Sequence, residues 1–99
     1  MTGIFELREY SVEPGRMAEL LGRFGGIREV FADCGMRAVG FWSSEERPNE
    51  FVYLLEHSGS PISNWAHFAD DPRWRALLTK GRPRVDVVSR MLRNAPFPE

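Results

Sequence analysis

The chain has 99 residues, and its 42% hydrophobic and 27% charged content is typical of one folded globular domain rather than of a disordered segment. Its 13 basic and 14 acidic side chains nearly cancel without a long run of either sign, which argues against a nucleic-acid partner. The single cysteine excludes an intrachain disulfide, and without a signal-peptide pattern or an apolar run of roughly 20 residues we expect a cytoplasmic protein with no membrane partner.

The first half of the chain predicts a strand, an interrupted helix and a second strand. Residues 4–12 are rich in strand-forming side chains and are followed by a Glu-Pro-Gly turn. Over residues 15–33, apolar side chains recur every three or four positions, which indicates a helix. Gly25 and Gly26 should kink or break it, because each weakens a helix by about 1 kcal/mol relative to alanine. A second strand is expected over residues 36–43.

The second half predicts two further strands and a helical region between them. Residues 50–57 form the third strand, and the short polar loop before it favours antiparallel pairing with the second. Ser-Pro at residues 60–61 and Asp-Pro at residues 71–72 are both helix-start signals. Residues 84–92 form the last strand. The order β-α-β-β-α-β predicts a single α+β domain of the ferredoxin-like class, with a four-stranded antiparallel sheet and helices on one face.

The predicted strands carry apolar side chains on both faces. The third strand, for example, places Phe51 and Tyr53 on one face and Val52 and Leu54 on the other. Helices can cover one face of the sheet. The other face would be a large apolar patch, and such a patch is seldom left exposed to water. Because two-fold dimers are the commonest oligomers, we expect the second face to pack against an identical chain in a homodimer.

An ordered set of short patterns in this chain resembles the NIPSNAP family. The set comprises Ile4-Phe-Glu-Leu-Arg-Glu-Tyr10, Pro14-Gly15, Gly35-Met36, Gly40-Phe41-Trp42, Val52-Tyr53-Leu54, Trp65-Ala-His-Phe68 and Asp71-Pro72-Arg-Trp74. The resemblance implies a dimeric α+β barrel. It also implies kinship with cofactor-free antibiotic-biosynthesis monooxygenases and with small isomerases, decarboxylases and haem-degrading proteins, without selecting one activity. On this basis we expect no tightly bound cofactor.

In relatives of this architecture, a pocket for a small molecule lies between the sheet and its helices. The side chains expected to line it are mostly aromatic with a few polar groups: Arg8, Tyr10, Trp42, Tyr53, His57, Trp65, His67 and Phe68. Strict alternation puts Trp42 on the same strand face as Met36 and Ala38. Trp42 and Trp65 could stack on a flat substrate, and the alternative is aromatic packing in the core.

Two histidines are candidates for proton transfer. His57 ends the third strand and His67 lies in the following helical region, and either could act as general acid or base near neutral pH. The alternatives are a half-exposed histidine beside a loop and a surface histidine on a helix. The two are not spaced as a metal-binding pair, so no metal is expected. Haem binding through one histidine is a weaker hypothesis.

Arg8 and Tyr10 share a face of the first strand. Arginine could hold an anionic or enolate oxygen, and Tyr10 could donate a hydrogen bond to it. The alternatives are an ion pair for Arg8 and an interface position for Tyr10. Together with these residues, the resemblance implies a homodimer that acts without a cofactor on an aromatic or polyketide-like substrate, in a monooxygenase- or isomerase-like reaction. The competing hypothesis is a non-catalytic dimeric module that binds a ligand or a protein.

Overall fold

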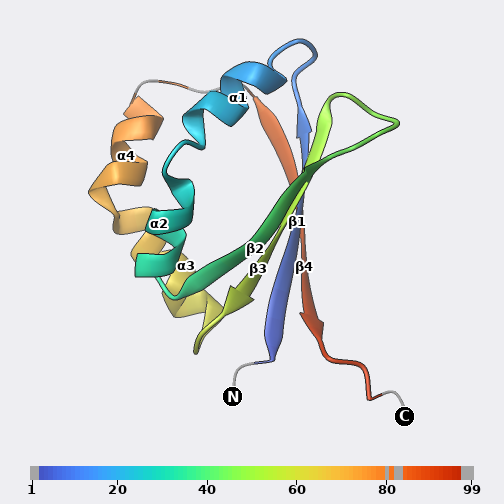
Figure 1. Ribbon diagram of the computed structural model, residues 1–99. Coiled ribbons are helices and arrows are strands. Elements are labelled where there is room, and N and C mark those ends of the chain that lie inside the picture. The colour runs from blue at the N-terminus through green and yellow to red at the C-terminus, as the bar shows by residue number, and fades with distance from the viewer. Residues whose placement is uncertain (1–2, 80, 82–83, 97–99) are drawn as a thin grey trace.

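The computed structural model describes residues 3–79, 81 and 84–96, and it confirms the predicted β-α-β-β-α-β order (Figure 1). The elements in chain order are β1 (Ile4–Val12), α1 (Met17–Arg23), α2 (Ile27–Asp33), β2 (Met36–Ser43), β3 (Glu50–His57), α3 (Pro61–Asp70), α4 (Pro72–Thr79) and β4 (Val85–Arg93). The last strand lies one residue further along the chain than predicted. Within the described residues, no helix combines the length and the apolar character needed to cross a bilayer.

The four strands form one antiparallel sheet in the order β2-β3-β1-β4. Strand β1 is central, so its side chains have neighbours on both sides. The register places Arg8 of β1 between Tyr53 of β3 and Ser89 of β4. This register brings together polar residues that are far apart in the sequence.

The helices cover one face of the sheet, as Figure 1 shows with the sheet seen nearly edge-on. The predicted break at the two glycines separates α1 from α2, and Gly26 takes a left-handed φ of 83° that glycine adopts without strain. The α3 helix starts as predicted, with the Ser60 hydroxyl accepting a hydrogen bond from the backbone N–H of Ser63 at 3.3 Å.

An aromatic core fills the space between sheet and helices. Phe31 of α2 stacks on Tyr53 with 5.7 Å between ring centroids and on Phe68 of α3 with 5.1 Å. Buried Phe51 and Tyr10 continue the cluster along the sheet, 5.5 Å apart. The same aromatic side chains that stabilise the fold therefore surround the space in which the predicted pocket should lie.

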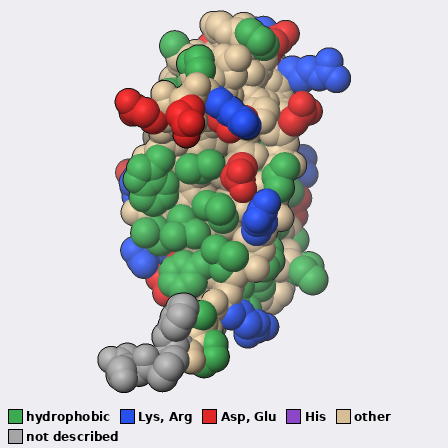
Figure 2. Space-filling model, turned by 90° about the vertical axis from the view of Figure 1, so that its right-hand side faces the viewer, with side chains coloured by type: hydrophobic (Ala, Val, Ile, Leu, Met, Phe, Trp, Pro, Cys, Tyr) green, Lys and Arg blue, Asp and Glu red, His purple; other side chains and the backbone are tan. Residues whose placement is uncertain are grey.

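The opposite face of the sheet carries no helix and is rich in apolar side chains (Figure 2). The register of the sheet assigns six apolar side chains to this face: Phe5 and Leu7 of β1, Val52 and Leu54 of β3, and Val88 and Leu92 of β4. We call this surface the open face. It agrees with the predicted two-faced strands, and its pairing with a second chain remains a prediction.

A register irregularity in β2 overturns the prediction for Trp42. The pairing with β3 shifts between Ala38 and Gly40, so one extra residue changes which side chains face the helices. Phe41 consequently points into the core, and Trp42 lies 51% exposed on the open face. Its ring lies against Gly40, where an added Cβ would stand 2.8 Å from the indole.

Candidate functional site

A cavity of about 210 Å³ lies between the helices and strands β1, β3 and β4, which we call the Arg8 cavity. Five of the predicted site residues line it: Arg8, Tyr10, Tyr53, Trp65 and Phe68. Phe24, Ile27, Phe31, Ala69, Trp74 and Val87 complete the wall. The described part of the wall is thus mostly aromatic, with Arg8 as its cation and two tyrosine hydroxyl groups on the sheet side.

The polar groups of the Arg8 cavity form a short chain of hydrogen bonds. Arg8 Nε donates to the Tyr53 hydroxyl at 2.8 Å, and the Tyr53 and Tyr10 hydroxyls are 2.8 Å apart. The Arg8 guanidinium also lies over the Trp65 ring, 4.4 Å from its centroid. Stacking and hydrogen bonding fix the orientation of the cation, which suits it to recognition of an oxyanion.

Tyr53 is a hydrogen-bond donor at neutral pH. Burial raises the pKa of its phenol well above the usual value of 10, and the neighbouring Tyr10 adds to this rise, although Arg8 acts against it. Because Arg8 Nε already donates to the Tyr53 oxygen, the Tyr53 proton is available for Tyr10 or for a bound ligand. The pair of tyrosines can therefore stabilise a negatively charged oxygen.

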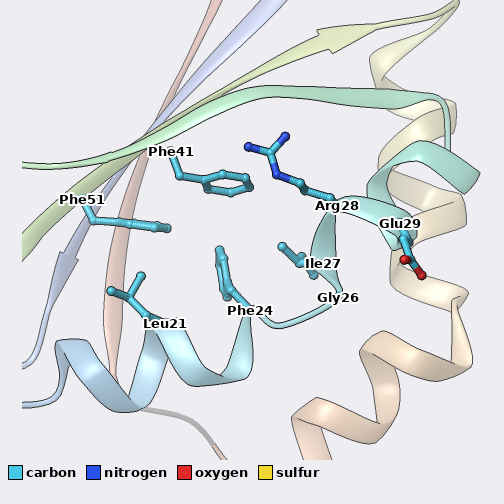
Figure 3. Close-up of a pocket in the computed structure, with 8 residues that line it drawn as sticks. All are labelled: Leu21, Phe24, Gly26, Ile27, Arg28, Glu29, Phe41 and Phe51. Atoms are coloured by element: carbon cyan, nitrogen blue, oxygen red, sulfur yellow. The ribbon is translucent and has the colours of Figure 1, made fainter.

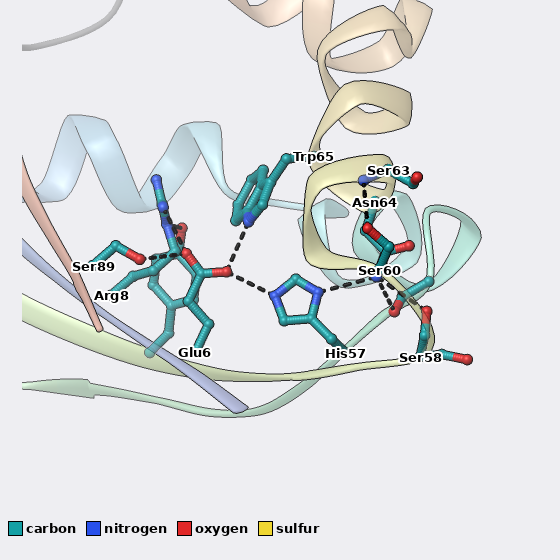
Figure 4. A network of polar contacts seen from close by, with 11 residues as sticks. Glu6, Arg8, His57, Ser58, Ser60, Ser63, Asn64, Trp65 and Ser89 are labelled. Carbon is teal, nitrogen blue, oxygen red and sulfur yellow. Dashed lines mark hydrogen bonds and ion pairs between the residues drawn. The ribbon is translucent and has the colours of Figure 1, made fainter. Parts of the chain in front are cut away.

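Beneath the Arg8 cavity, the Glu6 carboxylate accepts hydrogen bonds from four side chains (Figure 4). Its Oε1 accepts from His57 Nε2 at 2.7 Å and from Trp65 Nε1 at 2.7 Å. Its Oε2 accepts from Arg8 at 3.1 Å and from the Ser89 hydroxyl at 2.5 Å. Burial acts to raise the pKa of Glu6, but these four donors outweigh it and the pKa is lowered. Glu6 thereby fixes both the guanidinium and the indole of the cavity wall.

His57 takes part in this network rather than in the cavity wall. Its side chain is fully buried, and both ring nitrogens have partners. Asn64 Nδ2 lies 3.1 and 3.2 Å from the carbonyl oxygens of Gly35 and Ser58 and 3.0 Å from His57 Nδ1, and its two N–H groups are shared among these three acceptors. The ring proton therefore belongs on Nε2, which donates to Glu6. As arranged, His57 cannot reach a ligand in the cavity.

His67 does not reach the cavity either. It lies on the exposed side of α3, while Trp65 and Phe68 of the same helix face the sheet. This agrees with the alternative of a surface histidine. Neither histidine presents a free ring nitrogen to the cavity for a haem iron, and among the described residues no group of three His, Cys, Asp or Glu side chains could hold a metal ion.

Sequence reasoning missed three members of the network: Glu6, Asn64 and Ser89. A signal was present for Glu6, because it has the same parity on β1 as Arg8 and Tyr10 and so had to share their buried face. Asn64 gave no such signal, since its partners are backbone carbonyls and a histidine that only the fold brings near. Ser89 is identified only once β4 is placed next to β1.

Replacing Gly35 with alanine should disturb this network by displacing the Asn64 side chain. Gly35 has a φ of 86°, and an added Cβ would stand 2.6 Å from Asn64 Oδ1. Gly59→Ala is a matched control, because Gly59 has a φ of 79° but nothing within 4 Å of an added Cβ. In urea unfolding, Gly59→Ala should cost about 1 kcal/mol from the backbone alone, and Gly35→Ala about 1–2 kcal/mol more. Equal losses would contradict the role assigned to Asn64.

Comparison with known families matches residues 5–98 to the NIPSNAP family model, which covers nearly the whole chain. A crystal structure of a NIPSNAP family protein of unknown function from Agrobacterium tumefaciens is similar, with a TM-score of 0.78, 25% identity, and coverage of 96% of this chain and 90% of that chain. An uncharacterized NIPSNAP domain protein from Burkholderia xenovorans gives a TM-score of 0.74 and 20% identity over 97% and 98% of the two chains.

A variant of SnoaB, a cofactor-independent oxygenase from Streptomyces nogalater, shares the fold over the full length of both chains, with a TM-score of 0.67 and 16% identity. At this identity the similarity establishes a common fold and no more. No curated protein matches the sequence at a significant level.

Proposed function

The chain belongs to the NIPSNAP family, and we propose that it works as a homodimer that binds an anionic aromatic or polyketide-like small molecule in the Arg8 cavity and stabilises it for a reaction without a cofactor. The observation that carries this proposal is the fixed guanidinium of Arg8 beside two tyrosine hydroxyls, in a wall that is otherwise aromatic. The similarity in fold to a cofactor-independent oxygenase supports a monooxygenase- or isomerase-like reaction.

The charge of the cavity favours a ligand that is bound as an anion. Arg8 is positive and Tyr53 keeps its proton. The Glu6 carboxylate lies beneath the cavity wall, where its four donors occupy it. An enolate, phenolate or carboxylate oxygen would receive charge-assisted hydrogen bonds here, and its rings would pack against Trp65 and Phe68. In a cofactor-free oxygenation, an enolate or phenolate gives up its electrons to oxygen directly, so the task of the protein is to stabilise that anion.

Binding of naphthoate and of its neutral amide tests this proposal. We expect wild-type protein to prefer the anion, and Arg8→Met to weaken naphthoate binding by about 10- to 100-fold, because a hydrogen bond to a charged group contributes about 1.5–3 kcal/mol. The amide should bind both proteins alike, which controls for general damage to the cavity. Calorimetric titration gives both affinities. If naphthoate does not bind, or the variant treats anion and amide alike, the proposal is wrong.

The alternative is a dimeric binding module without catalysis, and one observation favours it. His57, the predicted general base, is buried with both nitrogens occupied. Among the described residues that line the Arg8 cavity, the ionisable side chains are Arg8, Tyr10 and Tyr53, and the first of these is a donor only. Oxygen uptake and product formation measured with bound hydroxylated aromatics separate the two functions. Uptake or conversion that Tyr53→Phe abolishes assigns catalysis, and binding without either assigns the module.

A further inference from the structure

A second cavity of about 380 Å³ lies between the α1–α2 connection and strands β2 and β3, and we call it the Phe41 cavity (Figure 3). Its walls include Leu21 and Phe24 of the α1 side, Ile27 of α2, and Phe41 and Phe51 of the sheet. Phe41 reaches this position only because of the register shift in β2. The irregularity that removes Trp42 from the helix side thus supplies an aromatic wall here.

The Phe41 cavity adjoins the Arg8 cavity, since Phe24 and Ile27 line both. The Phe24 ring is 6.0 Å from the ring of Tyr53 in the Arg8 cavity and 6.5 Å from the ring of Phe41. Phe24 is also the residue immediately before the two glycines that separate α1 from α2. The helix break therefore places one aromatic side chain as the partition between two cavities.

The Arg8 cavity is small for a drug-sized ligand, and the adjoining Phe41 cavity supplies further room. At about 210 Å³ the Arg8 cavity lies below the roughly 300–1,000 Å³ of pockets that enclose such ligands, and the Phe41 cavity adds about 380 Å³. We propose that the ligand site has two compartments: the Arg8 cavity holds the anionic end, and the Phe41 cavity holds a planar polycyclic aromatic body that extends past Phe24. This inference rests on the proposed function and adds the shape and polarity of the ligand.

The Phe41 cavity selects an apolar body rather than a second anion. Phe24, Phe41 and Phe51 line it with aromatic rings that also pack against one another. Arg28, the cation among the described residues that line it, is already engaged, because the guanidinium donates to the Ala38 carbonyl at 2.9 Å and lies 4.8 Å from the centroid of Phe41. Glu29 adds a negative charge at the rim. A ligand with one charged end and an uncharged aromatic far end fits both compartments.

Affinities for benzoate, naphthoate and anthracene carboxylate test this inference. Each fused ring should tighten binding to wild-type protein by about tenfold, the gain expected when its apolar surface leaves water. Leu21→Trp should fill the Phe41 cavity from its rim, because Leu21 lines the cavity and is 41% exposed. We expect it to weaken anthracene carboxylate by about tenfold or more and benzoate by less than about twofold.

Leu78→Trp is the matched control, since Leu78 is a helical leucine of similar exposure, 43%, outside both cavities. It should leave all three affinities unchanged. If benzoate binds through Arg8 but added rings bring no gain, or if Leu21→Trp affects all three ligands equally, the two-compartment site is wrong while the proposed function stands. If none of the three ligands binds wild-type protein, the proposed function fails and this inference fails with it.

Discussion

Glu6→Gln is expected to lower the free energy of unfolding at pH 7 by about 3 kcal/mol, because removing one partner of a buried ion pair leaves the other charge uncompensated. Glu6 is 1% exposed, and its carboxylate is the acceptor in all four of its hydrogen bonds. A glutamine must turn its NH₂ group toward some of these donors. A loss of this size is a large fraction of the roughly 5–15 kcal/mol that stabilises an ordinary domain.

Glu19→Gln is the matched control, on α1 and away from the open face. Its ion pair with Arg16 joins two exposed side chains, so its loss should cost much less stability than the loss of Glu6. Urea unfolding at one fixed protein concentration gives both values, because the stability of a dimer depends on concentration. Similar small losses for both variants would show that Glu6 does not organise the site.

The Glu6 effect should also depend on pH in one direction. The pKa of Glu6 in the folded protein is below its ordinary value of 4.5. The ionised carboxylate therefore contributes stability above about pH 4.5, and this contribution is lost as the pH falls through the folded pKa. The difference in unfolding free energy between wild type and Glu6→Gln should shrink from pH 7 to pH 3. A difference that stays constant over this range would contradict the assigned ionisation.

The backbone of this fold could be predicted from local patterns, whereas half of its polar site could not. Apolar periodicity and two adjacent glycines determine where α1 ends and α2 begins, so those boundaries are visible in the sequence. The bulge that turns Trp42 outward depends on pairing with β3, and no local pattern marks it. His57 is similar, since the partner that turns it away from the cavity, Glu6, lies 51 residues earlier. The residue types therefore indicated that a site exists, whereas the pairing of the strands determines which side chains form it.

Leu54→Lys is expected to convert the proposed homodimer to a monomer. Leu54 lies in the open face, opposite Leu7 of β1 and Gly40 of β2, where a lysine would become buried against an identical sheet. An unpaired buried charge costs several kcal/mol, so the dissociation constant should rise by about a thousandfold or more. Sedimentation velocity over a range of concentrations measures this. The open face is the proposed interface because sheets pack face to face about 10 Å apart through such apolar surfaces.

Leu78→Lys is the control for this prediction, because Leu78 is 43% exposed on α4, on the helix side of the sheet. If Leu78→Lys dissociates the protein and Leu54→Lys does not, the interface lies elsewhere.

The same central strand links assembly to the site. Residues of β1 alternate, so Leu7 faces the proposed partner while Glu6 and Arg8 face the helices. Loss of the partner should loosen the register that holds Arg8, and Leu54→Lys should therefore weaken naphthoate binding together with dimerisation.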